Sequence, residues 1–457
     1  MNSIRPFFFL FLFIISPFVS RSQSVYGTVS TPSALLADFY ALPFNDSVLF
    51  SYTEYTRAGE FTHKTKWMKE DGKVTDIILN IRPVAIAGNE EGIYYYYFVE
   101  DNKSLKLKAI VEDVHSHERK ESSSSLLFPK GIVLAAYQDL NMFFIIFDRE
   151  ANIITLLEVR DLDVVSEKHY NVPPLISKLL RKPSHVEFFN GSHSPINSFK
   201  GGSKVKLYRY TDLYLVIDSR SSDEKGTHVF RFPQNGREVE LFLFPIETSD
   251  DFVSFLVDNK LFRSVISPKK FILTVHDLSS EKPMGTTELV KSEQQLERFF
   301  RHARAKTVSK TQLSVKSLMK AAGVGDPSLT VFKDYDKYVI LWGIHVDDNG
   351  MIGPAGLNGL NPVAGFLTMV VGTAILQMME GPGISQHFYY QYDEKDVSFK
   401  LPEESSSYVR TKLDEYEIGK QAQKVKVKYK NYIPYKNGII AIYYEHKRKT
   451  ATLVNFQ

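Results

Sequence analysis

Short runs rich in β-branched and aromatic residues alternate with polar turns along most of the chain. Two such runs joined by a short polar turn predict a β-hairpin. Most of the turns contain Gly, Asn or Asp, as at Glu100-Asp101-Asn102-Lys103, which hairpin geometry favours. The predicted hairpins pair Ser47 to Tyr55 with His63 to Met68; Gly92 to Val99 with Leu105 to Val111; Asn141 to Phe147 with Ile153 to Val159; Leu213 to Asp218 with Thr227 to Phe232; Phe252 to Val257 with Phe271 to Val275; Tyr338 to Ile344 with His387 to Tyr392; and Gly438 to Tyr444 with Thr450 to Val454.

Three segments depart from this pattern. Pro173 to Pro183 places Leu175, Ile176, Leu179 and Leu180 at helical spacing, which predicts a short amphipathic helix between prolines. Residues 279–335 carry apolar residues on one helical face and predict a helical insertion. Residues 346–386 form an insertion that is apolar and almost free of charge.

The spacing of the hairpins indicates the fold class. Without the two long insertions, about 48 residues remain for each predicted hairpin, close to the roughly 40–50 residues of a four-stranded propeller blade. This rhythm resembles that of β-propeller repeat proteins, although the chain has no Trp-Asp dipeptide or other blade motif. The resemblance implies a mainly β, antiparallel, propeller-like fold of about six or seven blades. A large β-sandwich or two β-domains is the alternative.

The first residues predict export. Arg5 precedes an apolar run from Phe7 to Val19, and small residues follow at Ser20 and Ser22. This order is typical of a secretory signal peptide, and the run is shorter than the roughly 20 residues that span a bilayer. We therefore expect residues 1–22 to be a signal peptide and residues 23–457 to form one propeller-like domain.

Composition narrows the function classes. The 457 residues are 43% hydrophobic and 24% charged, with no cysteine and a formal net charge of +3. A large core can form, whereas disulfides, cysteine-ligated metals and a lipoprotein anchor are excluded. The balanced charge argues against a nucleic-acid partner. Together these features predict an exported protein of the periplasm, cell surface or extracellular space that is not a lipoprotein.

The most informative departure from the average composition lies in the second insertion. Every residue from Asn349 to Met379 is uncharged, and glycine- and proline-rich stretches flank the apolar part. This segment could cover the β structure, insert into a membrane, or dock to a partner protein; long apolar loops between paired strands are often functional. The residues expected to dock to a partner or membrane are Phe366, Leu367, Met369, Val370, Val371, Ile375 and Leu376.

No catalytic chemistry is evident in the sequence. It lacks a Gly-x-Ser-x-Gly elbow, a His-Glu-x-x-His helix, a phosphate-binding glycine loop and an EF-hand loop, so no catalytic, cofactor or metal residue is predicted. His115 and His117 could share one strand face and bind a metal, but their charged surroundings favour a solvated loop. Tyr94 to Tyr97 predicts a strand whose two faces are mostly core.

These observations predict a non-catalytic binding or assembly module of the cell envelope. Its partner would be an envelope protein or a membrane surface, reached through the apolar insertion and holding the protein peripherally at a membrane. The alternative is a carbohydrate-active enzyme or glycan-binding protein on a β-propeller scaffold. A structural protein whose insertion is only core is a third interpretation.

Overall fold

The computed structural model describes most of the predicted β structure. The described residues are 24–30, 35–44, 47–55, 61–69, 74–79, 81, 83–88, 92–101, 104–113, 116–129, 131–138, 141–180, 186–190, 204–235, 238–246, 251–266, 270–279, 283–290, 326–334, 337–346, 384–396, 398–400, 427–435, 438–445 and 448–456. All structural statements below concern these residues.

The described strands form seven separate sheets, which we number I to VII. Sheet I contains β2 (Leu35–Phe44), β3 (Ser47–Tyr55), β4 (Phe61–Lys69) and β5 (Val74–Leu79). Sheet II contains β6 (Ala85–Gly88), β7 (Gly92–Asp101), β8 (Ser104–Asp113) and β9 (Arg119–Pro129). Sheet III contains β10 (Ile132–Gln138), β11 (Met142–Asp148), β12 (Ile153–Arg160) and β13 (Asp163–Asn171).

The remaining four sheets follow the same serial order. Sheet IV contains β14 (Val186–Asn190), β15 (Val205–Arg209), β16 (Leu213–Ser219), β17 (Gly226–Phe232) and β18 (Glu240–Pro245), and sheet V contains β19 (Asp251–Val257), β20 (Lys260–Ile266), β21 (Lys270–Asp277) and β22 (Pro283–Val290). Sheet VI contains β23 (Asp326–Asp334), β24 (Lys337–Val346), β25 (Ile384–Asp393) and β26 (Ser398–Lys400). Sheet VII contains β27 (Val427–Tyr435), β28 (Gly438–Glu445) and β29 (Thr450–Phe456) together with β1 (Ser24–Ser30).

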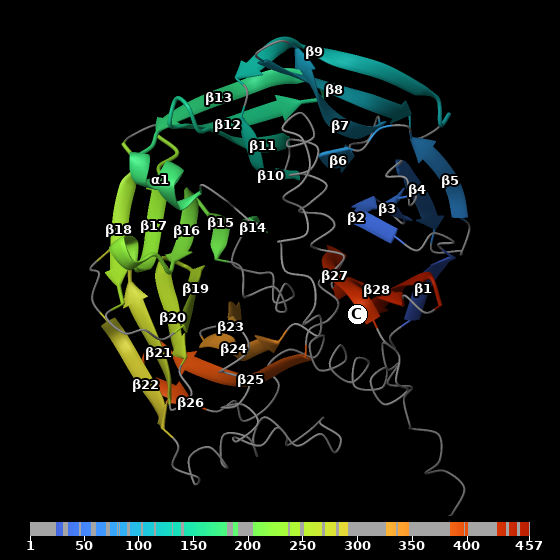
Figure 1. Ribbon diagram of the computed structural model, residues 1–457. Coiled ribbons are helices and arrows are strands. Elements are labelled where there is room, and N and C mark those ends of the chain that lie inside the picture. The colour runs from blue at the N-terminus through green and yellow to red at the C-terminus, as the bar shows by residue number, and fades with distance from the viewer. Residues whose placement is uncertain are drawn as a thin grey trace, which may run out of the picture.

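The sheets are arranged around a ring, which confirms the predicted propeller-like fold (Figure 1). A sandwich would instead pack two large sheets face to face, so that alternative is wrong. The N-terminal strand closes the ring, because β1 pairs antiparallel with β29 near the other end of the chain. Figure 1 shows this junction, where blue β1 joins the red strands of the same sheet; β29 lies between β1 and β28. One pairing departs from the antiparallel pattern: β14 is parallel to β15.

Burial along the strands follows from this arrangement. All seven residues of β16 are buried, and so are six of the seven in β11. A strand buried on both faces is expected where a sheet is packed between two neighbouring sheets. By contrast β13, at the edge of sheet III, alternates exposed and partly buried positions along most of its length. Continuous apolar runs thus mark interior strands, and alternating runs mark edges.

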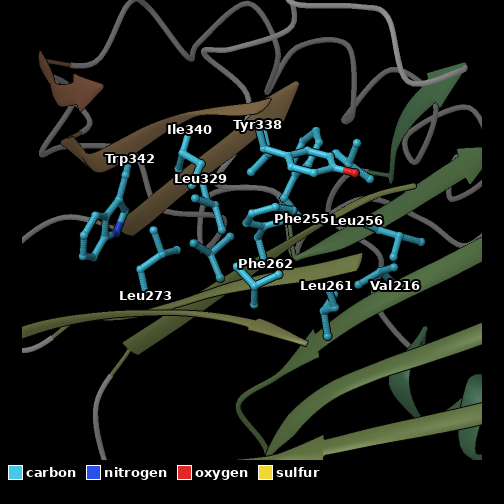
Figure 2. Packing of buried hydrophobic residues seen from close by; sticks show 14 of the residues in the cluster. Val216, Phe255, Leu256, Leu261, Phe262, Leu273, Leu329, Tyr338, Ile340 and Trp342 are labelled. Carbon is cyan, nitrogen blue, oxygen red and sulfur yellow. The ribbon is translucent and has the colours of Figure 1, made fainter. Parts of the chain in front are cut away.

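The hydrophobic cores lie between neighbouring sheets. One cluster joins Val216 of sheet IV, Phe255 and Leu273 of sheet V, and Tyr338 and Trp342 of sheet VI (Figure 2). Another joins sheets III and IV and includes Ile176 of helix α1 (Pro174–Leu179), which confirms the predicted short helix. Further clusters join sheets VII and I, I and II, and II and III.

Six of the seven predicted hairpins are confirmed as directly paired strands: β3–β4, β7–β8, β11–β12, β16–β17, β24–β25 and β28–β29. The pairing of Phe252 to Val257 with Phe271 to Val275 is wrong, because β20 lies between these strands and pairs with both. The Asp258-Asn259 turn joins β19 to β20, and both turn residues have positive φ, at 48° and 62°. Such a two-residue turn is the sequence signal that marks β19 and β20 as a hairpin.

The predicted insertions need shorter boundaries. Within 279–335, Pro283–Val290 and Asp326–Asp334 are strands, because their alternating polar and apolar residues complete sheets V and VI. Within 346–386, Val346 ends β24 and residues 384–386 begin β25. The rest of both insertions and the predicted signal peptide lie outside the described residues. The described helices are all too short or too polar to cross a bilayer.

Candidate functional site

A pocket of about 240 Å³ lies between sheet III and the β15–β16 turn of sheet IV. Sheet III supplies its floor through one row of directly paired residues. Tyr137 on β10 lies opposite Phe143 on β11, which lies opposite Glu158 on β12, which in turn lies opposite Ser166 on β13. Because directly opposite residues point to the same face, this row brings two rings, a carboxylate and a hydroxyl to one surface.

Arg209 at the end of β15 caps the aromatic part of this floor. Its Cζ atom lies 4.5 Å from the ring centroid of Phe143 and 5.0 Å from that of Tyr137. Its Nη1 atom also donates a hydrogen bond to the Tyr137 hydroxyl. The Tyr137 ring is stacked against Phe143 at 5.0 Å and against Phe188 of β14 at 4.5 Å. The guanidinium is therefore held in place by two rings and a hydroxyl.

Asp212 organises the turn that forms the opposite wall. Its carboxylate accepts hydrogen bonds from Arg231 Nε at 2.7 Å and from the Gln234 amide at 3.0 Å. The hydrogen bond to Asp212 raises the pKa of Arg231. Burial raises the pKa of the Tyr170 hydroxyl, the Asp212 charge adds to this shift, and the hydroxyl donates to the Pro233 carbonyl at 3.1 Å. Asp212 thus has a structural role.

Two further charged side chains line the pocket. Lys168 Nζ donates to the Gln234 carbonyl at 3.0 Å. Glu158 Oε1 accepts from Asn141 Nδ2 at 2.6 Å. The two carboxylates of the pocket are both bonded to structural groups, one of them to a cation. This arrangement provides hydrogen-bond donors and acceptors for recognition.

A serine–histidine pair is buried in sheet I, away from this pocket. Ser51 Oγ lies 2.5 Å from His63 Nε2, and Thr53 Oγ1 lies 3.0 Å from His63 Nδ1. All three side chains are buried, and the third partner is a neutral threonine where a hydrolase triad has a carboxylate. We interpret this cluster as a satisfied polar group of the core.

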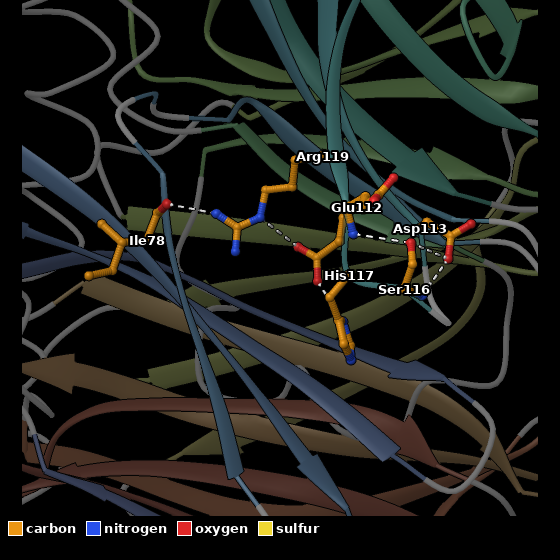
Figure 3. A network of polar contacts seen from close by, with 7 residues as sticks. Ile78, Glu112, Asp113, Ser116, His117 and Arg119 are labelled. Carbon is orange, nitrogen blue, oxygen red and sulfur yellow. Dashed lines mark hydrogen bonds and ion pairs between the residues drawn. The ribbon is translucent and has the colours of Figure 1, made fainter.

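A second polar network links sheets I and II (Figure 3). The Glu112 side chain is fully buried; its Oε1 atom is hydrogen-bonded to His117 Nδ1 at 3.1 Å, and its Oε2 atom forms an ion pair with Arg119 Nε at 3.3 Å. Arg119 Nη1 also donates to the Ile78 carbonyl of β5 at 3.2 Å. The turn that carries His117 is exposed and its φ is 60°. His117 therefore belongs to a surface turn, as its charged surroundings predicted, and His115 lies outside the described residues.

Other predicted features can be placed as follows. Among the described residues, no three His, Cys, Asp or Glu side chains come together as metal ligands would. Tyr94, Tyr95 and Tyr96 are buried, and the half-buried Tyr97 donates to Glu121 Oε1 at 2.9 Å, so the strand with core on both faces is confirmed. The predicted docking residues lie outside the described residues: Phe366, Leu367, Met369, Val370, Val371, Ile375 and Leu376.

Comparisons with known proteins give no family assignment. No family model matches the chain, and no curated protein matches it. Similar solved structures include a prolyl endopeptidase (11% identity, 90% of this chain and 46% of that chain, TM-score 0.35). A second is a neuraminidase-like protein of A/little yellow-shouldered bat/Guatemala (10% identity, 71% of this chain and 95% of that chain, TM-score 0.32). A third is a GH43 β-xylosidase/α-arabinofuranosidase from a compost microbial metagenome (12% identity, 59% of this chain and 95% of that chain, TM-score 0.26).

These similarities are too low to bear on activity or substrate. The chain also spans less than half the length of the prolyl endopeptidase chain that it matches.

Sequence reasoning missed the pocket. The pairing of Phe143 with Glu158 follows from the predicted hairpin and its turn at Asp148 to Asn152. The approach of Arg209 to the same row depends on how sheet IV packs against sheet III, which no periodicity encodes.

Proposed function

We propose that this protein is a non-catalytic, exported binding or assembly module of the cell envelope. Its propeller-like scaffold would dock to an envelope protein or a membrane surface through the uncharged segment Asn349 to Met379. The apolar, charge-free character of this segment supports the proposal.

The observation that carries the proposal is the register of the hairpin on which this segment is inserted. β24 and β25 pair without interruption from Lys337 opposite Asp393 to Val346 opposite Ile384. Both ends of the segment therefore leave from one cross-strand pair at one end of sheet VI. Most connections in compact domains are about 4–6 residues long, and much longer ones are usually functional or linkers.

The same register supplies a clean test. Residues 347–383 can be replaced by Asn-Gly, a two-residue hairpin turn, because Val346 and Ile384 are directly opposite each other. We expect the replacement variant to fold but to lose co-sedimentation with envelope membranes and to lose crosslinked partners. A second variant, in the full chain, changes Phe366, Leu367, Val370 and Val371 to Ser and is expected to show the same loss.

The matched control removes apolar surface elsewhere. Leu241 and Leu243 of β18 are 41% and 47% exposed, and their double change to Ser should leave membrane and partner recovery unchanged. Unaltered membrane and partner recovery in both segment variants would refute the docking function.

A second candidate function is glycan binding, and the pocket at Arg209 favours it. Its lining combines aromatic rings, hydroxyls, carboxylates and cations, the mixture that sugar hydroxyls can bond. Glycosidases use a pair of carboxylates, and Asp212 is held in an ion pair with Arg231, so Glu158 is the remaining carboxylate of the lining and binding fits the pocket better than hydrolysis. A glycan array and a hydrolase screen on the whole protein test this candidate, and a negative result in both would exclude it.

A further inference from the structure

We propose that the pocket at Arg209 binds a free amino acid in its zwitterionic form. The ligand ammonium would bond Glu158, and the ligand carboxylate would bond Lys168. This inference goes beyond docking through the uncharged segment, and it gives the pocket a different ligand from the glycan of the second candidate function.

Glu158 and Lys168 lie on one face of sheet III without forming an ion pair. Glu158 is directly opposite Ser166, and Lys168 is directly opposite Leu156, so the two charged residues are diagonal neighbours on the pocket floor. Diagonal positions are about 7–8 Å apart, which is within reach of long side chains. Within the described part of the chain, no cation pairs with Glu158 and no carboxylate pairs with Lys168. One negative and one positive charge therefore face the pocket without a counter-charge.

Neutral groups hold these two charges. The Glu158 Oε1 atom accepts from Asn141 Nδ2 at 2.6 Å, on the connection before β11. The Lys168 ammonium donates to the Gln234 carbonyl at 3.0 Å, just after β17. Glu158 keeps its Oε2 atom for a ligand, and the ammonium keeps two of its three donors. Because both side chains already have a partner, a ligand that bonds them costs less side-chain entropy than one that must order them.

The rest of the lining suits the apolar part of a small amino acid. Leu156 lies two residues before Glu158 on β12 and opposite Lys168, so it separates the two charges on the floor. Leu213 and Phe232 are further apolar residues of the lining. The volume, about 240 Å³, is below the roughly 300–1,000 Å³ of pockets for drug-sized molecules. This size favours one amino acid over a peptide or an oligosaccharide.

The other charged residues of the lining already have structural roles. The guanidinium of Arg209 packs over two rings and donates to the Tyr137 hydroxyl, so it forms a wall of the pocket. Asp212 Oδ2 forms an ion pair with Arg231 Nε at 2.7 Å. Recognition of the zwitterion would therefore depend on the carboxylate of β12 and the ammonium of β13.

Calorimetric titration of the whole protein at neutral pH with four forms of leucine tests both contacts. L-Leucine carries both charges, L-leucinamide carries only the ammonium, N-acetyl-L-leucine carries only the carboxylate, and N-acetyl-L-leucinamide carries neither. We expect leucine to bind about tenfold more tightly than either singly charged form, because each of these forms loses one charge-assisted hydrogen bond. The uncharged form should bind most weakly.

Two variants assign one contact each. Lys168→Met should weaken leucine binding about tenfold but leave leucinamide binding unchanged, because leucinamide has no carboxylate. Glu158→Gln should weaken leucine binding about tenfold but leave N-acetyl-leucine binding unchanged, because that form has no ammonium. The matched controls are Lys120→Met and Glu150→Gln, at exposed positions on β9 and in the turn after β11, and both should bind leucine as the parent does.

Unfolding midpoints show whether each variant is folded. Should one variant fail to fold, the other variant and the four ligands on the parent protein decide. Leucine that binds no more tightly than one of its singly charged forms would overturn the inference, because one contact would then be absent. Leucine binding that Lys168→Met or Glu158→Gln leaves unchanged would place the site elsewhere and also overturn it. Binding of a neutral sugar without binding of leucine would overturn the inference and favour the glycan candidate.

Discussion

Lys206 Nζ lies 3.2 Å from Asp218 Oδ2, and the two side chains are 0% and 1% exposed. Asp218 also accepts hydrogen bonds from Thr227 Oγ1 at 2.8 Å and from Ser254 Oγ at 2.7 Å. Ser254 belongs to β19, so this carboxylate joins sheets IV and V through buried polar contacts. A buried charge is tolerated only when it is paired and hydrogen-bonded, and here both conditions are met.

Removal of this carboxylate should be strongly destabilising. Asp218→Ala leaves the Lys206 ammonium buried without its partner and removes the acceptor of two hydroxyls, so the free energy of unfolding should fall by about 3–5 kcal/mol. Denaturant unfolding followed by circular dichroism measures the change. The control is Asp223→Ala, whose side chain is 75% exposed and pairs with Lys178 at 4.0 Å; it should change stability by about 0.5 kcal/mol or less. Equal losses in the two variants would contradict the structural role.

Because β1 closes the ring, its removal should lower the free energy of unfolding. β1 pairs with β29 from Ser24 opposite Asn455 to Ser30 opposite Thr450, and Val29 is 2% exposed against the core of sheets VII and I. Deletion of residues 1–30 removes this pairing and exposes the edge of β29. We expect the free energy of unfolding to fall by about 1.5–3 kcal/mol or more, since burying one valine-sized side chain contributes this range, and we expect the variant to aggregate.

The comparison for this deletion is a chain that lacks only residues 1–22. It retains β1 and should unfold at the midpoint of the full chain. If both truncations unfolded at the same midpoint, β1 would contribute nothing to closure.

The fold could largely be predicted because hairpins are local. Short connections join five of the six confirmed pairs, and those of β3–β4, β7–β8, β11–β12 and β16–β17 contain Gly, Asn or Asp. Strand spacing indicated the propeller-like class. Strand β20 was not predicted, because the turn before it consists only of Asp258-Asn259 and resembles part of a longer loop. The parallel strand β14 was not predicted for another reason: its partner β15 begins at Val205, and no short turn sets the register of the two strands.

The pocket was much harder to predict. Periodicity assigns Glu158 and Ser166 to a sheet face, but it does not say which turn of the next sheet covers that face. Arg209 and Asp212 reach it through packing of side chains between sheets III and IV. Contacts of this kind depend on tertiary structure and leave no pattern in the sequence.

Buried tyrosines predict a loss of stability at alkaline pH. Burial raises the pKa of Tyr96, Tyr208 and Tyr210 above the ordinary value of 10, and it raises that of Tyr97 to about 12. Above pH 10 the unfolded chain releases these protons and the folded chain retains them, so stability present below pH 10 is lost as pH rises. Burial lowers the pKa of Arg263 to about 10. Above that pH the folded chain loses this proton before the unfolded chain does, so this one group opposes the loss of stability.

Unfolding free energies measured from pH 8 to pH 11.5 test the trend. The slope above pH 10 should be less steep in Tyr96→Phe, because one proton no longer contributes. At pH 8 the same variant should lose about 1 kcal/mol, since the hydroxyl of Tyr96 donates to the Asp161 carbonyl at 2.6 Å. Stability that is flat or rising above pH 10 would contradict the expectation.

The two tryptophans offer a test of cooperativity around the ring. Trp342 in sheet VI is fully buried, its ring packs edge-on against Phe271 at 5.6 Å, and its Nε1 atom donates to Ser264 Oγ of sheet V. Trp342→Phe leaves the buried Ser264 hydroxyl without this donor and should cost about 1–3 kcal/mol. Fluorescence of this variant reports only on Trp67 of sheet I, whereas Trp67→Phe reports only on Trp342.

Because successive sheets share hydrophobic cores, we expect each single-tryptophan variant to unfold in one step, with the same midpoint by fluorescence and by circular dichroism. Each midpoint will shift with the cost of its own substitution, so agreement between the two probes within a variant is the decisive quantity. Two midpoints that differ within one variant would show that sheets I and VI belong to separate cooperative units. The shared cores would then be too weak to couple neighbouring sheets around the ring.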